Sequence, residues 1–337
     1  MKYSGIDLHS NNCVVVVTDE QDRVLVSKRL SNQLEAIIAL LAPHRDELSG
    51  VVVESTYNWY WLVDGLQAAG FVVHLANTTA MVRYEGLKHS DDESDAIQLA
   101  RLLRLNILPV GHIVEKAARA TRDLARKRMQ LVRDRSRHVV AIENIMNRET
   151  GARLTANVVK RLTAQAVDEM PFHEDVRLAI QANSAIVRSL NAEIERIETR
   201  LHVRVSPRPE TALLKTAPGI GAILANVILL ETGPIRRFAE VGNYASYCRC
   251  VDSKRVSNGK KKGEGNTKNS NKYLAWAYVE AAHFALRFCP EAKRFYERKK
   301  AKTNGIVAIK ALAHKLARAC YHMLREGAAF DLQRCFA

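Results

Sequence analysis

Short apolar runs separated by amphipathic segments fill the first 110 residues of the chain. Residues 1–28 contain three β-rich runs, KYSGID, CVVVVTD and RVLVSK, which predict three strands of a meander. The pattern then predicts, in order, a helix at 33–41, a strand that ends at Glu54, a helix at 59–69, a strand at 71–76 and an amphipathic helix at 94–105. The order β-β-β-α-β-α-β-α is that of a ribonuclease-H-like sheet. We therefore expect a mixed α/β domain at residues 1–112.

From about Glu115 to Leu201 the apolar spacing becomes that of long helices. Spacings of three and four alternate, as in a coiled-coil seam, along Val187, Leu190, Ile194, Ile197 and Leu201. Two such helices in a hairpin are expected to pack along this stripe and to turn their arginines outward. Such a stripe is more often core packing within one chain than a dimer seam. Because a projecting hairpin has little else to cover its stripe, we nevertheless expect residues 113–207 to form a helical coiled-coil region that mediates dimerisation and binds nucleic acid.

A mainly helical third domain is expected at residues 208–337. Its start, LLKTAPGIGAILANVILLE, has a tight turn with Gly219 and Gly221 between two helical stretches, as a helix-hairpin-helix element does. Such a turn suits a phosphate because it exposes backbone N–H groups, although a plain helix connector has the same pattern. Residues 252–272 hold seven Lys and Arg against two acids and predict a flexible basic loop. Helices rich in alanine resume at Tyr273.

The net charge of +15 is unevenly distributed along the chain. Through Val110 there are 9 Lys and Arg against 14 Asp and Glu, and after it there are 42 against 22. A basic body joined to a mildly acidic N-terminal domain indicates that the body binds a polyanion, most simply a nucleic acid. The candidate contacts are Arg119, Arg122, Arg126, Arg133, Arg137, Lys254, Arg255, Lys260, Lys261, Lys262 and Lys268.

The six cysteines are scattered, with no C-x-x-C pair, which favours a reducing compartment. No run approaches the roughly 18 apolar residues of a membrane helix, and MKYSGIDLHS lacks the apolar core of a signal peptide. We therefore expect a cytoplasmic protein without a membrane partner.

Four carboxylates are expected to converge in the first domain. Asp7 and Glu54 end the first and fourth predicted strands, which are neighbours in a ribonuclease-H-like sheet, and Asp92 and Asp95 share one face of the following helix. Mutual repulsion disfavours such a cluster unless cations lie between the oxygens, and hard oxygen ligands suit Mg²⁺ or Mn²⁺. Two such ions stabilise both the attacking and the leaving oxygen of a phosphodiester.

Helix capping is the simpler explanation for part of the acidic run SDDESD, because acids are favoured at a helix N-terminus. Asp91 replaces Asp92 in the set if the helix begins earlier, since Asp91 and Asp95 also share a face. His9, two residues beyond Asp7, is in a position to lie beside the metals.

At this point the chain resembles a known group, the insertion-sequence transposases and Piv-type DNA invertases that join a RuvC-like DEDD domain to a C-terminal serine-bearing domain. The matching pieces cover nearly the whole chain and are GIDLH at 5–9, VVVEST at 51–56, DESDAIQLA at 92–100, TAPGIG at 216–221, RFAEVGNYASYC at 237–248 and SNGKKKGEGNTKNSNKYL at 257–274.

The resemblance implies DNA recombination through a 5′-phosphoserine intermediate. It assigns the metal-binding tetrad to Asp7, Glu54, Asp92 and Asp95, and the nucleophile to Ser257. It also implies a structured bridge RNA that pairs with target and donor DNA, and dimers that assemble into a tetramer. Where the family has Gly-Leu-x-Pro before the serine, this chain has RCVD at 249–252, which leaves Ser253 as a competing nucleophile.

Two other functions use the same features. A junction-resolving nuclease would activate water with the same four carboxylates and would form no bond between protein and DNA. A nucleic-acid-binding protein derived from an inactive transposase would keep the basic surfaces without the chemistry.

Overall fold

The computed structural model describes residues 1–81, 91–251, 255–263 and 269–336. The chain divides into two compact units. The N-terminal unit comprises Met1–Lys116 and Ser253–Asn269, and the C-terminal unit comprises Ala117–Asp252 and Ser270–Ala337. All six cysteines are free thiols.

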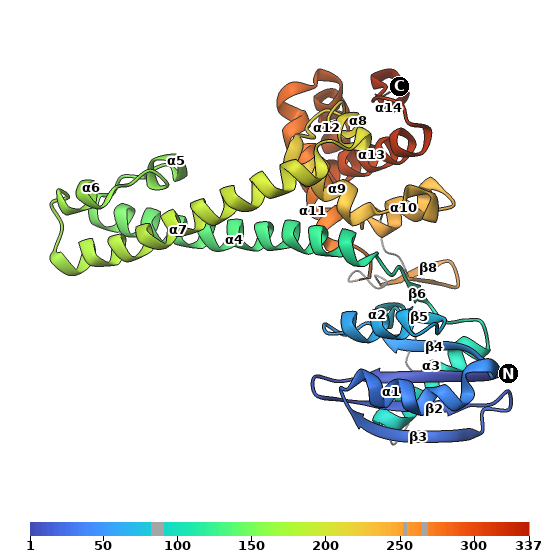
Figure 1. Cartoon of the computed structure of the whole chain (residues 1–337). Coiled ribbons are helices and arrows are strands. Elements are labelled where there is room, and N and C mark those ends of the chain that lie inside the picture. The colour runs from blue at the N-terminus through green and yellow to red at the C-terminus, as the bar shows by residue number, and fades with distance from the viewer. Residues whose placement is uncertain (82–90, 252–254, 264–268, 337) are drawn as a thin grey trace. The chain divides into compact units, whose positions relative to one another are not determined.

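A six-stranded sheet, in the order β3-β2-β1-β4-β5-β6, forms the centre of the N-terminal unit (Figure 1). The strands are β1 Lys2–Leu8, β2 Asn12–Thr18, β3 Val24–Ser31, β4 Leu48–Glu54, β5 Val73–Ala76 and β6 Val110–Gly111. Strand β1 pairs with β2 in an antiparallel and with β4 in a parallel arrangement. The mixed α/β prediction is confirmed, as is the prediction that the first and fourth strands are neighbours.

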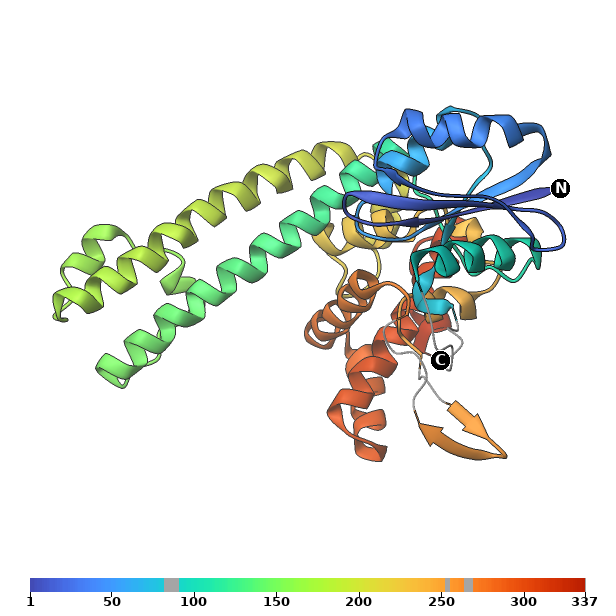
Figure 2. The same ribbon diagram turned by 90° about the horizontal axis from the view of Figure 1, so that it is seen from below.

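Helices cover both faces of this sheet (Figure 2). Helices α1 Leu34–Leu41 and α2 Tyr60–Ala68 lie on one face, and α3 Asp92–Arg104 lies on the other. Successive residues of a strand point to opposite faces, so Val51 and Val53 pack with α1 and α2 while Val52 packs with α3. Burial on both faces explains why β4 reads as a continuous apolar run. Two short 3-10 helices, η1 Ala42–Glu47 and η2 Thr78–Ala80, complete the connections.

Gly5 of β1 lets α3 approach the sheet closely. A Cβ atom built on Gly5 would lie 1.9 Å from the carbonyl oxygen of Ala96 and 2.9 Å from the amide nitrogen of Ala100. Both contacts are with helix backbone, which cannot rotate away as a side chain can. The absence of a side chain at Gly5 therefore sets the height of α3 above β1.

Replacing Gly5 with alanine is expected to lower the free energy of unfolding by about 3 kcal/mol, the upper part of the range for overpacked cores. The matched control is Gly242→Ala, because a Cβ at Gly242 meets nothing within 4 Å. This position lies inside α10 Val241–Tyr247, where alanine is favoured by up to about 1 kcal/mol. Chemical unfolding followed by circular dichroism measures both variants, and equal stabilities would contradict the close approach of α3.

Two long antiparallel helices, α4 Lys116–Thr150 and α7 Glu174–Val205, run side by side in the C-terminal unit (Figures 1 and 2). Polar pairs join them along their length, namely Arg128 with Glu198 at 2.5 Å, Arg135 with Asn191 at 2.8 Å and His138 with Asn183 at 2.8 Å. Two short helices, α5 Ala156–Val159 and α6 Ala164–Asp168, connect them.

The predicted apolar seam is buried inside this helical hairpin. Val187 packs with Ile142 of α4, and Ile197 and Leu201 pack with Ala125 of α4. The observed packing agrees with the predicted hairpin, because α4 covers the stripe, and the expected dimerisation stays a prediction. The seam consequently gives no reason of its own to expect a second copy of the chain.

A buried ion pair fixes α4 to the rest of the C-terminal unit. The Arg126 guanidinium donates two hydrogen bonds to the Glu231 carboxylate, at 2.6 and 2.7 Å, and lies 4.5 Å from the centre of the Tyr273 ring. The Asn271 amide donates a further hydrogen bond to Glu231 at 2.8 Å. These contacts join α4, α9 and the start of α11, and the sequence analysis did not anticipate them.

The remaining helices of the C-terminal unit form a bundle around a common core. They are α8 Pro209–Leu214, α9 Ala222–Thr232, α10 Val241–Tyr247, α11 Lys272–Phe288, α12 Pro290–Lys302, α13 Gly305–Glu326 and α14 Leu332–Phe336, with a short 3-10 helix η3 Ile235–Arg237. Tyr244 and Tyr278 are fully buried in this core and share a hydrogen bond of 2.7 Å between their hydroxyls. Burial raises the pKa of both phenols. Among the described residues, no helix combines the length and apolarity that crossing a bilayer requires.

Part of the predicted basic loop is a β-hairpin. Strands β7 Arg255–Ser257 and β8 Lys260–Gly263 pair antiparallel, and Asn258 and Gly259 between them have φ angles of +49° and +69°. Positive φ at both central residues is the type I′ turn that Asn-Gly favours. The prediction of a loop is therefore wrong for residues 255–263, which form two paired strands. The alternative nucleophile Ser253 and the predicted contacts Lys254 and Lys268 lie outside the described residues.

Candidate metal-binding site

Asp7 and Glu54 occupy adjacent positions at the ends of two parallel strands. Ile6 of β1 pairs with Val53 of β4, so the next residue of each strand is the acid. Glu54 lies two residues beyond Val52, which packs with α3, and the alternation of the strand therefore puts Glu54 on that face. Asp7 lies two residues beyond Gly5, which contacts α3, so it faces the same way. Asp7 is only 3% exposed, and Glu54 is half-buried.

The first turn of α3 brings further carboxylates to this face. Asp91 is the N-cap, and its side chain accepts a hydrogen bond from the backbone N–H of Ser94 at 2.8 Å. This bond holds the pKa of the Asp91 carboxyl below its usual range. Asp92 and Asp95 follow, both half-buried and one turn apart. Asp91 therefore serves the capping role, and Asp92 is the residue that lies near Asp7.

His9 brings Asp7 and Asp92 together. Its Nε2 atom lies 3.2 Å from Oδ2 of Asp7 and 3.2 Å from Oδ1 of Asp92. These three side chains each offer a ligand atom, and the atoms lie within 4.8 Å of one another. Glu54 lies at the C-terminal end of β4, and Asp95 lies in the first turn of α3. Among the described residues, neither belongs to this closest group.

Arg29 reaches this cluster from the edge strand β3. Its guanidinium donates to Oδ2 of Asp92 at 2.6 Å and to Oδ1 of Asn12 at 2.7 Å. The contact with Arg29 is the main cause that lowers the pKa of Asp92. Arg29 pairs with Val14 of β2, which itself pairs with Asp7, so the three residues form one row across the sheet. Nothing near Arg29 in the sequence marks this row, so the sequence alone does not predict its contact with Asp92.

The cluster has the chemistry of a divalent-cation site. A buried carboxylate such as Asp7 is costly unless a cation or hydrogen bonds compensate its charge. Among the described residues, the basic side chain within ion-pair distance of Asp7 is His9, which is charged only when protonated. Carboxylate oxygens suit Mg²⁺ and Mn²⁺, and an imidazole nitrogen suits transition metals. The residues present therefore fit a divalent ion, with Asp7 and Asp92 as its nearest carboxylates.

Ser257 lies in the β7–β8 hairpin, which groups with the N-terminal unit and not with the helices that flank it in the sequence. It is exposed and pairs across the hairpin with Lys260, directly beside the Asn-Gly turn. Lys260, Lys261 and Lys262 are exposed along β8. In the same unit, the Thr79 hydroxyl donates to the Asn269 side chain at 3.3 Å.

The predicted basic contacts on α4 differ in how far their side chains are exposed. Arg133 and Arg137 are exposed and line a groove together with Lys127 and Tyr273, as an outward orientation requires. Arg119 is 2% exposed, so the expected outward orientation is wrong for it. Arg126 keeps 29% of its side chain exposed and lines the same groove, but its guanidinium is paired with the buried Glu231. The side chain of Arg122 is 12% exposed and lies 3.4 Å from Asp123.

The turn with Gly219 and Gly221 connects α8 to α9, as predicted. Gly219 has a φ of +80°, and a Cβ there would lie 2.1 Å from the carbonyl oxygen of Ala281 in α11. Gly219 is thus required by packing. Gly221 is exposed at the N-cap of α9, and a Cβ there would meet nothing within 4 Å. Only Gly221 has the open backbone that a phosphate contact needs.

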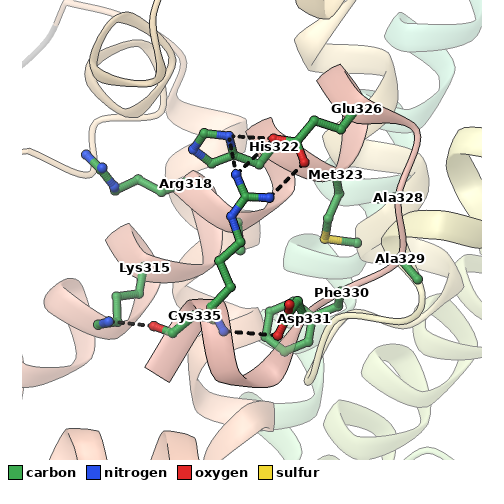
Figure 3. A pocket seen from close by; sticks show the side chains of 12 residues that line it. Lys315, Arg318, His322, Met323, Glu326, Ala328, Ala329, Phe330, Asp331 and Cys335 are labelled. Atoms are coloured by element: carbon green, nitrogen blue, oxygen red, sulfur yellow. Dashed lines mark hydrogen bonds and ion pairs between the residues drawn. The ribbon is translucent and has the colours of Figure 1, made fainter. Parts of the chain in front are cut away.

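A pocket in the C-terminal unit lies between α13 and α14 (Figure 3). Its charged groups are largely paired with one another. Glu326 accepts hydrogen bonds from Arg334 at 2.7 and 2.9 Å, and these lower the pKa of its carboxyl. Lys315 donates to the carbonyl oxygen of Cys335 at 2.5 Å. These contacts fasten the C-terminal helix to α13, and we assign no ligand to the pocket.

Two stretches of the chain match known protein families. Residues 4–149 match a DEDD family described as "Transposase". Residues 211–297 match the "Transposase IS116/IS110/IS902 family". The first match includes the strands and helix that carry Asp7, Glu54, Asp92 and Asp95, and the second includes Ser257.

Three curated relatives align with the chain. The "Transposase for insertion sequence element IS1328" of Yersinia enterocolitica is 24% identical over 97% of this chain and 98% of its own. The "Probable family 20 transposase" of Pseudomonas aeruginosa is 22% identical over 95% of this chain and 96% of its own. The "Insertion element IS110 uncharacterized 43.6 kDa protein" of Streptomyces coelicolor is 21% identical over 53% of this chain and 44% of its own.

Proposed function

We propose that the chain is an insertion-sequence transposase that cuts and rejoins DNA through a serine nucleophile, because residues 4–149 and 211–297 match transposase families. One observation supports this most strongly. Within the part of the chain that matches the DEDD transposase family, Asp7 and Asp92 come together from β1 and α3 around His9.

The four carboxylates Asp7, Glu54, Asp92 and Asp95 would hold Mg²⁺ or Mn²⁺. A bound divalent ion supplies electrostatic stabilisation of the attacking and leaving oxygens of a phosphodiester. The protein provides the rigid frame, since Asp7 and Glu54 lie on neighbouring strands and Asp92 and Asp95 in the first turn of one helix. Arg29 holds the Asp92 carboxylate in its ionised form, which is the form that binds a cation.

Ser257 is the proposed nucleophile. Its Oγ atom would attack the phosphorus, forming a serine–phosphate ester while the bond to the DNA 3′ oxygen breaks and that oxygen leaves as a hydroxyl. The ester retains the free energy of the broken phosphodiester, so attack by another 3′ hydroxyl can rejoin the strands. Two observations support this assignment, namely the exposure of Ser257 beside Lys260 and the grouping of its hairpin with the unit that carries the carboxylates.

Nucleic acid is the proposed partner on the basic surfaces. Arg133, Arg137 and Lys127 line the groove of α4, and Lys260 to Lys262 project from the hairpin. The partners are target and donor double-stranded DNA and a structured guide RNA encoded by the element, with dimers of the protein assembling into a tetramer across both DNAs. The RNA and the tetramer rest on the family resemblance alone. Contacts of this kind make binding steeply salt-dependent.

A covalent protein–DNA adduct tests the proposal. Purified protein is incubated with Mg²⁺, the flanking RNA of the element and supercoiled DNA that carries the element ends, and the products are separated on a denaturing gel. We expect an adduct that mass spectrometry maps to the peptide containing Ser257, and its complete loss in Ser257→Ala. Ser253→Ala is the matched control and should retain the adduct.

The other outcomes identify the competing functions. Cut DNA without an adduct would indicate a metal-dependent nuclease that activates water. Retained DNA binding without any cutting would indicate a nucleic-acid-binding protein that has lost its chemistry. An adduct that survives in Ser257→Ala and disappears in Ser253→Ala would move the nucleophile to Ser253.

A further inference from the structure

We propose that His9 is a direct ligand of the divalent ion held by Asp7 and Asp92, and that its imidazole makes the site prefer Mn²⁺ to Mg²⁺. The inference rests on the proposed function for the presence of a divalent ion. His9 would add a nitrogen ligand to a set that otherwise consists of carboxylates. This nitrogen ligand would give the site its metal preference.

The spacing of the three groups is that of ligands around one ion. In an octahedral complex with bonds of about 2.1 Å, adjacent ligand atoms lie about 3.0 Å apart. Nε2 of His9 lies 3.2 Å from an oxygen of Asp7 and 3.2 Å from an oxygen of Asp92. Nε2 is shielded from solvent and has no hydrogen-bond partner among the described residues. A cation between the three atoms would satisfy all of them without moving the backbone.

The backbone around His9 is held in place. Its N–H donates to the carbonyl oxygen of Asn12 at 2.9 Å. Its carbonyl oxygen accepts from the side chains of Asn32, at 3.0 Å, and Asn58, at 2.9 Å. These contacts come from three segments of the N-terminal unit and fix the turn after β1. The imidazole of His9 therefore extends from a fixed backbone position.

The ligand chemistry predicts the preference. Mg²⁺ is a hard ion that takes oxygen ligands and water, whereas first-row transition metals accept imidazole nitrogen as well as carboxylate oxygen. A site with two carboxylates and one imidazole therefore binds Mn²⁺ more tightly than a site with the carboxylates alone, and binds Mg²⁺ little better.

His9 has one competing role, that of a protonated counter-ion which occupies the position of the metal. The two roles have opposite consequences for the His9→Ala variant. Removing a ligand weakens Mn²⁺ binding, whereas removing a competing cation strengthens the binding of both ions.

Isothermal titration of the full-length protein with Mn²⁺ and with Mg²⁺ distinguishes them. We expect His9→Ala to weaken Mn²⁺ binding at least tenfold and Mg²⁺ binding by less than threefold. His112→Ala, an exposed histidine of the same unit, is the matched control and should change neither. Unchanged or tighter Mn²⁺ binding in His9→Ala, or an equal loss for both ions, would overturn the proposal.

Spectroscopy of the unmutated protein provides a second readout that does not depend on the folding of a variant. Electron spin-echo spectra of bound Mn²⁺ should show coupling to an imidazole nitrogen, and their absence would also overturn the proposal. The variant Asp92→Asn separates the failure of the proposed carboxylate site from the failure of the proposed role of His9. If it leaves the binding of both ions intact, the proposed carboxylate site itself is wrong. If it abolishes binding while His9→Ala has no effect, only the role of His9 is wrong.

Discussion

Replacing Glu231 with glutamine is expected to lower the free energy of unfolding by about 3 kcal/mol, toward the lower end of the range for breaking a buried ion pair. The Glu231 side chain is 3% exposed and accepts hydrogen bonds from Arg126 and Asn271. Glutamine keeps the size of the side chain but removes the charge that compensates the Arg126 guanidinium. Because Arg126 is itself 29% exposed, water reduces part of the cost. Chemical unfolding followed by helical circular dichroism measures the loss.

The matched control is Glu198→Gln. Glu198 pairs with Arg128 on the same helix α4, but its side chain is 36% exposed, and the change is expected to cost less than about 1 kcal/mol. The double replacement Arg126→Met with Glu231→Leu should recover most of the stability, because it removes both buried charges. Equal losses for Glu231→Gln and Glu198→Gln would contradict a structural role for the buried pair.

The parts of the fold that the sequence predicts are those whose apolar pattern is set by burial. The run of valines in β4 is buried on both faces, which leaves a continuous apolar signature. The hairpin β7–β8 was missed because its strands are short and mostly charged, and only Asn258-Gly259 marks it. The seam of α7 was predicted, but its pattern alone does not show what covers it. An apolar stripe has the same pattern whether another helix of the chain or a second copy covers it.

In the candidate site, too, the sequence predicts the residues that a local pattern marks and misses those that only tertiary packing brings together. Asp7, Glu54 and Asp92 were predicted because each ends or begins a predicted element. Asp91 and Asp92 could not be separated, because the choice depends on the residue at which α3 begins. Arg29 lies near Asp92 because β3 pairs with β2 and β2 pairs with β1, which places Arg29 in the same row of the sheet as Asp7. The pairing of Arg126 with Glu231 spans 105 positions in the sequence. Such partners follow from tertiary packing, and no local pattern encodes them.

Replacing Asp7 with asparagine is expected to have opposite effects on stability with and without a divalent ion. In the absence of the ion, the variant should be more stable by about 0.5 to 2 kcal/mol, as is common when a functional charge is removed from a buried site. Asp7 is 3% exposed, and its basic neighbour within ion-pair distance, His9, carries a charge only when protonated, so the Asp7 carboxylate is poorly compensated. In the presence of Mn²⁺ at 100 times its dissociation constant, the natural protein should gain about 2.7 kcal/mol and the variant almost nothing.

Unfolding curves with and without Mn²⁺ measure both effects. Glu93→Gln, an exposed acid in the same helical turn, is the matched control and should keep the stabilisation by Mn²⁺. DNA cleavage by Asp7→Asn should fall by about 10² to 10³-fold, which corresponds to the several kcal/mol that a catalytic ion contributes. If Asp7→Asn were still stabilised by Mn²⁺, the ion would bind elsewhere. If cleavage were lost without any gain in metal-free stability, the charge of Asp7 would be compensated in the folded protein by more than its contact with His9.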